Sequence, residues 1–243
     1  MKCYIKDYPR PQFVRNDWEN LNGTWDFGFD DENAGEKEKW YQEFKGDKKI
    51  NVPFTYETKL SGIQDETRHD FIWYHRTINV DGVKLENNRY ILHFEGSDFI
   101  TKVWVNGAYA GSHRGGYARC SFDVTNLVHD GENELTVKVE DSFDTQQPRG
   151  KQRWINENFG CWYVQTTGIW KTVWSEYVPK ISLASVKMTP DLQNAALKLE
   201  YEVAAAEKDL DDDLMITATV SFRGTTVAKQ CVLANQKHVE TTI

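Results

Sequence analysis

The sequence predicts an all-β protein, in which an antiparallel jelly-roll sandwich is followed by a truncated immunoglobulin-like β-sandwich. Short runs of alternating apolar and polar residues recur at regular intervals, and the turns between them are rich in Asn and Gly. Helical periodicity is almost absent. Tryptophan disappears after Pro179, which indicates that a second domain begins there. These observations exclude a parallel α/β fold.

The first predicted elements are aromatic. One face of an early strand carries Trp25, Phe27 and Phe29. Residues 36–44 instead place Trp40, Tyr41 and Phe44 at helical spacing, which predicts one short amphipathic helix lying on a sheet.

From Phe71 the pattern changes to strands in quick succession. Alternating apolar residues predict strands over residues 72–80, 90–94, 100–105, 120–124 and 135–139. Asn106-Gly107 is the strongest hairpin signal in the chain, and residues 108–112 are expected to form the returning strand. Three histidines on or near these strands, His75, His93 and His113, have no partner spacing and receive no catalytic role.

The predicted domain boundary lies near Lys180, giving domains at residues 1–179 and 180–243. The second domain shows alternating strands at residues 181–189, 197–203, 214–222 and 227–233. An immunoglobulin-like sandwich needs about seven strands. We therefore expect the chain to be a fragment that is cut within or soon after this domain.

Bulk properties exclude several classes of function. A formal net charge of -8 argues against nucleic acid as a partner, because binding phosphates needs a basic face. No apolar run is long enough to span a membrane and no signal peptide is visible, so we expect a cytoplasmic protein without membrane contact. The four cysteines are widely spaced and are expected to be free thiols. No cofactor or metal motif occurs.

The candidate recognition surface is the stretch before Thr167-Gly168-Ile169-Trp170, which leads into a half-buried strand predicted at residues 171–178. Residues 146–153 contain too many polar, Pro and Gly residues for a core element and predict a long loop. The following residues are dense in tryptophan, and loops held by a rigid strand commonly carry binding sites.

Eight motifs in order give the chain a family resemblance over residues 8–178. They are Tyr8-Pro9-Arg10-Pro11-Gln12-Phe13, Leu21-Asn22-Gly23-Thr24-Trp25, Val52-Pro53-Phe54, Trp73-Tyr74-His75-Arg76, Val103-Trp104-Val105-Asn106-Gly107, Phe122-Asp123-Val124-Thr125, Gln147-Pro148-Arg149-Gly150-Lys151-Gln152 and Thr167-Gly168-Ile169-Trp170. Together they resemble the N-terminal sugar-binding domain of glycoside hydrolase family 2, the β-galactosidase, β-glucuronidase and β-mannosidase family. The resemblance implies a galactose-binding-domain-like jelly roll, then an immunoglobulin-like domain, then a catalytic TIM barrel.

The resemblance places catalysis outside this chain. In the family, two glutamates on the barrel perform retaining hydrolysis of β-glycosides, so the chain has no catalytic residue of its own and is expected to be inactive alone. The first domain contributes a wall of the sugar pocket through the loop before the Gly-Ile motif. Galactosidases and glucuronidases carry an aspartate six residues before that glycine, whereas this chain has Trp162.

The candidate substrate-binding residues fall into three groups, each with a structural alternative. Trp154, Trp162 and Tyr163 form a sugar-stacking surface or pack beneath the loop. Arg149, Lys151 and Gln152 donate to sugar hydroxyls or hold the loop by ion pairs. Asp144 accepts from vicinal sugar hydroxyls or caps a turn. The charged loop at residues 65–70 is expected to be solvated, although in the family it can approach the pocket.

Three functions remain open. The preferred one is the non-catalytic N-terminal region of a family 2 glycoside hydrolase, whose partners are a β-glycoside and the catalytic barrel of the same chain. The alternatives are a stand-alone carbohydrate-binding module and a structural role in a homo-oligomer, which large family members often form.

Overall fold

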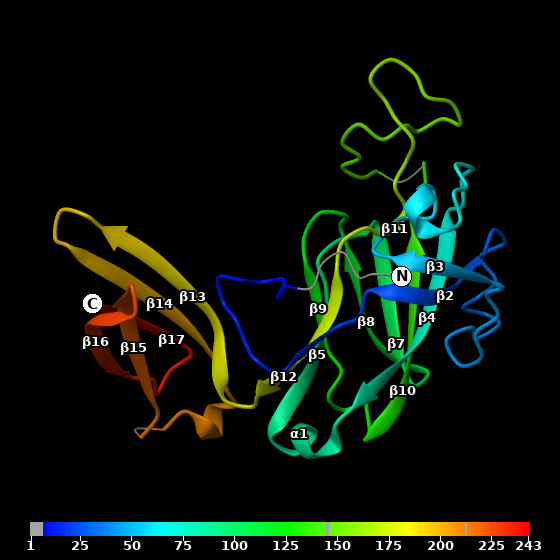
Figure 1. Ribbon diagram of the computed structural model, residues 1–243. Coiled ribbons are helices and arrows are strands. Elements are labelled where there is room, and N and C mark those ends of the chain that lie inside the picture. The colour runs from blue at the N-terminus through cyan, green and yellow to red at the C-terminus, as the bar shows by residue number, and fades with distance from the viewer. Residues whose placement is uncertain (1–6, 144–145, 212) are drawn as a thin grey trace. The chain divides into compact units, whose positions relative to one another are not determined.

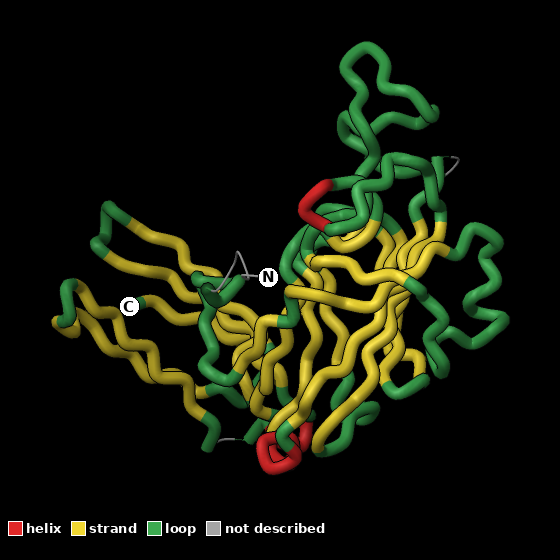
Figure 2. Tube along the Cα trace, turned by 45° about the vertical axis from the view of Figure 1, so that its right-hand side comes forward, coloured by secondary structure: helices red, strands yellow, loops and turns green. Residues whose placement is uncertain are grey.

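The computed structural model describes residues 7–143, 146–211 and 213–243. These residues form two compact units. Unit 1 holds residues 7–9 and 15–177, and unit 2 holds Arg10–Val14 and residues 178–243. Strands dominate both units (Figure 2).

Unit 1 is a two-sheet antiparallel sandwich, as its alternating sequence predicts (Figure 1). The six-stranded sheet has the order β3 (Lys48–Val52), β2 (Gly23–Phe29), β4 (Phe71–Val80), β10 (Gly131–Glu140), β7 (Ile100–Val105) and β8 (Ala108–Arg114). The four-stranded sheet has the order β1 (Trp18–Asn20), β12 (Val173–Pro179), β5 (Asn88–Phe94) and β9 (Cys120–Asp123). A short pair joins β6 (Ser97–Asp98) to β11 (Gly168–Ile169).

The core of unit 1 comes from the inward residues of these strands. In β10 every second residue points inward: Leu135, Val137 and Val139 are fully buried in the core. Their neighbours on the strand point to the other face of the sheet. Trp25, Phe27 and Tyr74 meet edge to face in the same core, where ring edges complement ring faces.

The hairpin predicted at Asn106-Gly107 is confirmed. β7 and β8 pair antiparallel on either side of it, with Val105 opposite Ala108. Asn106 and Gly107 have φ values of 51° and 77°, the left-handed conformations that a tight two-residue turn requires.

The helix predicted for residues 36–44 is wrong, because the segment is a series of turns. Lys39 has a φ of 57°, which interrupts the regular ladder of helical hydrogen bonds. The amide of Trp40 bonds instead to the carbonyl of Gly35 at 2.9 Å. The aromatic spacing arises because this segment covers the sheet: Tyr41 stacks on Trp104 with ring centroids 5.3 Å apart.

The short helix α1 (Gly82–Asn87) has no counterpart in the sequence analysis. Its first amides, on Val83 and Lys84, donate to the Asp81 side chain at 3.0 and 3.2 Å. Two single turns of 3-10 helix occur elsewhere, at Lys59–Ser61 and Glu207–Asp209. No helix within the described ranges is long and apolar enough to span a membrane.

Unit 2 is also built of antiparallel strands. Its three-stranded sheet has the order β13 (Ser182–Asp191), β14 (Ala196–Ala204) and β17 (His238–Thr242), and β15 (Met215–Phe222) pairs with β16 (Thr225–Leu233). The first four of these in chain order match predicted strands, whereas β17 was missed. Leu199, Tyr201 and Val239 lie at the centre of its small core.

Three of the four cysteines lie in described residues. Cys120 is buried, Cys161 and Cys231 are exposed, and all three are free thiols as expected. Cys3 lies outside the described residues.

Candidate functional site

Residues 146–167, which precede β11, form a loop that projects beyond the strands of unit 1 (Figure 1). Its two limbs pair through backbone bonds: Tyr163 donates to Lys151 at 2.8 Å and Arg153 donates to Tyr163 at 2.7 Å. Near the tip, Phe159 and Trp162 exchange backbone hydrogen bonds of 3.3 and 2.8 Å. We call residues 146–167 the projecting loop.

The aromatic residues of the projecting loop pack on one another. Trp154 lies 4.6 Å from Trp162 and 5.1 Å from Phe159, measured between ring centroids and in edge-to-face geometry. Trp154 remains 42% exposed and Tyr163 62% exposed. The loop therefore presents aromatic surface to solvent, which is what stacking on a sugar needs. The sugar-stacking role of Trp154, Trp162 and Tyr163 stays a prediction.

Two of the three predicted donors bond within the chain. Arg149 donates to the Ser142 carbonyl, and one guanidinium nitrogen lies 4.0 Å from Asp141. The Gln152 amide donates to Asp98 at 2.8 Å, and its oxygen accepts from the Thr166 amide at 2.8 Å. These contacts hold the base of the projecting loop.

Lys151 is exposed on the same loop, so its ammonium group is open to solvent. Whether Arg149, Lys151 and Gln152 also contact sugar stays a prediction. Asp144, the seventh candidate, lies outside the described residues.

Three buried carboxyl groups, which sequence reasoning missed, support the base of the loop. Asp98 accepts from Gln152, Asp141 from Gln147 at 2.5 Å, and Glu57 from the Thr167 amide at 3.0 Å. Gln152 lies 54 residues from Asp98 and Thr167 lies 110 residues from Glu57, so no sequence spacing reveals the group.

Burial raises the pKa of all three carboxyl groups, because a charge loses its hydration inside the protein. The pKa of Glu57 rises to about 7, that of Asp98 to about 6, and that of Asp141 moves in the same direction. Among the described residues, Asp98 Oδ1 and Glu57 Oε2 have no hydrogen-bond partner. Glu57 therefore titrates near neutral pH.

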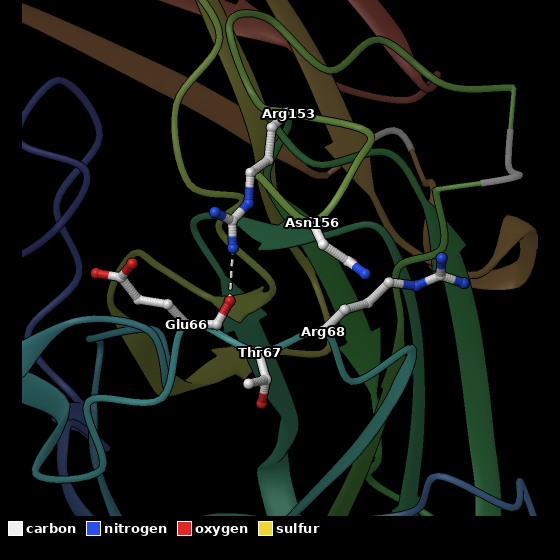
Figure 3. Close-up of a pocket in the computed structure, with 5 residues that line it drawn as sticks. All are labelled: Glu66, Thr67, Arg68, Arg153 and Asn156. Carbon is white, nitrogen blue, oxygen red and sulfur yellow. Dashed lines mark hydrogen bonds between the residues drawn. The ribbon is translucent and has the colours of Figure 1, made fainter. Parts of the chain in front are cut away.

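Arg153 ties the projecting loop to the charged loop before β4. Only 6% exposed, it donates to the Gln165 side chain at 2.9 Å, to the Asn158 side chain at 3.2 Å and to the Glu66 carbonyl at 2.6 Å. Figure 3 shows the guanidinium group pointing at that carbonyl. From sequence alone, an arginine within a polar run is expected to be exposed to solvent. Only its tertiary contact with residue 66 reveals its structural role.

An open pocket of about 690 Å³ lies between the projecting loop and the charged loop at residues 65–70. Its lining comes from Glu66, Thr67, Arg68, Arg153 and Asn156 (Figure 3). The Arg68 guanidinium is held by Asp70. The amide, hydroxyl and carboxylate groups of the lining can exchange hydrogen bonds with the hydroxyls of a sugar.

Gly168 fixes the strand that follows the loop. It has a φ of 92°, and a Cβ atom at this position would lie 2.1 Å from the Tyr74 hydroxyl. The same hydroxyl accepts from the Ile169 amide at 3.2 Å. Glycine is required here because no side chain fits between the strand and Tyr74.

One exposed group in unit 2 has the residue types of a metal site. Ligand atoms of Glu200, His238 and Glu240 lie within 4.8 Å of one another. Lys187 and Lys198 already pair with these carboxylates at 2.8 and 3.0 Å. The group is therefore a network of cross-strand ion pairs, and we assign it no metal.

Comparison with known proteins gives the family. Residues 18–175 match the model of the glycosyl hydrolases family 2, sugar binding domain. The chain is 32% identical to a putative beta-glucuronidase of Formosa agariphila over 143 residues, which covers 58% of this chain and 16% of that protein. It is 25% identical to the beta-galactosidase of Thermoanaerobacter pseudethanolicus over 216 residues, covering 86% of this chain and 26% of that protein.

Solved structures show the same fold. A b-glucuronidase from Ruminococcus gnavus aligns with a TM-score of 0.72 at 20% identity, covering 95% of this chain and 40% of that chain. The Beta-glucuronidase of an uncultured Clostridium sp. aligns with a TM-score of 0.69 at 24% identity, covering 94% of this chain and 40% of that chain. The chain thus spans less than half the length of these relatives. The family match covers most of unit 1, and the chain belongs to glycoside hydrolase family 2.

Proposed function

We propose that this chain is the N-terminal, non-catalytic region of a glycoside hydrolase that cleaves the O-glycosyl bond of a β-glycoside with retention of configuration. Residues 1–179 act as its sugar-binding domain, and residues 180–243 belong to an immunoglobulin-like domain. The catalytic carboxylates lie on a barrel outside these residues. The match of residues 18–175 to the family's sugar-binding domain carries this proposal.

The projecting loop supplies the sugar-facing wall in this proposal. It combines exposed rings at Trp154 and Tyr163 with the exposed cation of Lys151. Arg153 and the buried carboxyl groups hold the loop in place, so little conformational freedom is lost when sugar binds. The family resemblance leads us to expect an aspartate at the position of Trp162, so in this proposal an indole ring replaces a hydrogen-bond acceptor at that point of the wall.

The first experiment compares the 243-residue chain with the protein encoded by the whole reading frame. Both are assayed with p-nitrophenyl β-galactoside and β-glucuronide. We expect hydrolysis by the longer protein alone, because paired carboxylates about 5 Å apart are needed for retaining chemistry. Hydrolysis by the 243-residue chain above the buffer rate would refute the proposal.

The second experiment tests the wall. Tyr163→Ala in the longer protein is expected to raise KM about tenfold, because a stacking ring contributes about 1 kcal/mol or more. Tyr109→Ala is the matched control, since Tyr109 is also an exposed tyrosine, at 54%, but lies on β8. If both variants keep the wild-type KM, the projecting loop is not the wall.

The same pair of variants tests the structural alternative. If Tyr163→Ala leaves KM unchanged but dissociates an oligomer on size-exclusion chromatography, the loop serves assembly instead of sugar binding.

A further inference from the structure

A second pocket lies on the outer face of the six-stranded sheet. It has a volume of about 480 Å³, within the range of ~300–1,000 Å³ that is typical of small-molecule sites. It shares no lining residue with the pocket beside the projecting loop. Its walls are the strands β2, β4 and β10 and the series of turns at residues 36–46.

Strand register brings the polar groups of this pocket together. His75 on β4 lies directly opposite Asp26 on β2 and Thr136 on β10, so the three side chains share the outer face. Glu134 precedes Thr136 by two residues and therefore lies on that face as well. The His75 ring has Glu134 at 2.7 Å from Nε2 and Asp26 at 3.6 Å from Nδ1.

Aromatic rings from the series of turns form the opposite wall. Phe44 stacks on His75, with ring centroids 5.1 Å apart and planes within 18°. Trp40 meets Phe44 edge to face at 6.3 Å. Two glycines allow this segment to approach the sheet so closely, because a Cβ atom on Gly28 would lie 2.7 Å from the Cα of Gly46.

The acceptors of this pocket remain accessible to a solute. The side chain of Glu134 is 53% exposed and that of Asp26 is 36% exposed, although both flank His75. Gln42 at the rim is exposed and offers an amide donor and acceptor. Such a pocket suits a sugar. The carboxylates and the amide oxygen can accept hydrogen bonds from its hydroxyls, and the aromatic rings can pack against the C–H face of its ring.

We propose that this pocket binds a neutral saccharide, at a site separate from the projecting loop. The carboxylates of Asp26 and Glu134 accept hydrogen bonds from sugar hydroxyls, and the rings of Trp40 and Phe44 supply the apolar wall. Lys49 pairs with Asp26, so its one ammonium group faces the two carboxylates of the pocket. Because the carboxylates outnumber it, we expect them to repel an anionic sugar such as a uronate.

The test is a titration of the 243-residue chain with lactose, cellobiose and glucuronic acid. Binding is followed by calorimetry and by the side-chain 1H–15N resonances of His75. We expect saturable binding of a neutral disaccharide at millimolar concentration, with a shift of the His75 resonances and no comparable response to glucuronic acid. Glu134→Gln is expected to weaken this binding about tenfold, because it replaces a charged acceptor with a neutral one.

Two control variants separate this site from other sites. Glu132→Gln makes the same charge change two residues earlier on β10, at a side chain that does not line the pocket, and should leave binding unchanged. Tyr163→Ala alters the projecting loop only and should also leave it unchanged. Gln42→Ala is a second, exposed pocket variant and should weaken it.

Four results would overturn the inference: no saturable response to either disaccharide, equal weakening by Glu134→Gln and Glu132→Gln, glucuronic acid binding as tightly as the neutral sugars, or loss of binding in Tyr163→Ala alone. Loss of binding in Tyr163→Ala alone would assign the sugar to the projecting loop, which supports the proposed function and refutes the second site.

Discussion

Replacing Glu57 with glutamine should stabilise unit 1 above pH 7 and destabilise it by about 1 kcal/mol near pH 4.5. Glu57 is 5% exposed, and burial raises its pKa from 4.5 to about 7. At about 1.4 kcal/mol per pKa unit, charging this buried group costs the folded state about 3 kcal/mol. Because the folded-state pKa is the higher one, the stability is fully present below pH 4.5 and is lost as the pH rises to about 7.

Glutamine removes the charge and keeps an oxygen that can accept from Thr167. The extra amide donors of glutamine need hydrogen-bond partners, and leaving them without partners costs about 1 kcal/mol. Subtracting this from the charging cost that is removed leaves a net stabilisation of about 2 kcal/mol above pH 7. Urea unfolding followed by tryptophan fluorescence measures it for unit 1 alone, since all nine tryptophans lie in that unit. Glu132→Gln, at an exposed glutamate, is the control. A Glu57→Gln variant whose stability relative to wild type is the same at both pH values would refute the reasoning.

Three further predictions concern the backbone and the loop. Gly168→Ala should destabilise unit 1 by about 2 kcal/mol or more in the same urea assay, because the added methyl group collides with the Tyr74 hydroxyl and its φ is strained; an unchanged midpoint would contradict this. Arg153→Ala should speed amide hydrogen exchange in residues 153–165, because three hydrogen bonds that close the loop are lost, and unaltered exchange there would show that the loop holds without it. Lys39→Gly should raise the free energy of unfolding by about 0.5–1 kcal/mol by relieving a left-handed backbone, and a lowered value would show that the Lys39 side chain matters more.

Local signals predicted the strands of unit 1 well. β10 and the Asn106-Gly107 hairpin follow directly from alternation and turn chemistry, because a strand with one buried face must alternate. The same reasoning failed at residues 36–44, where aromatic spacing suggested a helix. The spacing of those rings follows from the sheet that they cover. The left-handed conformation of Lys39 cannot be predicted from local helix propensity.

The candidate site was predictable only in outline. Exposed Trp154 and Tyr163 lie on the loop that the sequence singled out. Arg153, Glu57 and Asp98 escaped notice because their roles depend on partners tens of residues away.

The sequence by itself determined an antiparallel all-β chain of family 2, since alternation, turn residues and ordered motifs are local properties of the chain. Only the tertiary structure decided which charged residues are buried and which side chains share a pocket. His75 shows the reason: nothing near it in sequence marks it as special, yet strand pairing places Asp26 and Glu134 beside it. Register between distant strands is set by packing of the whole sandwich, so such clusters arise only when the chain folds.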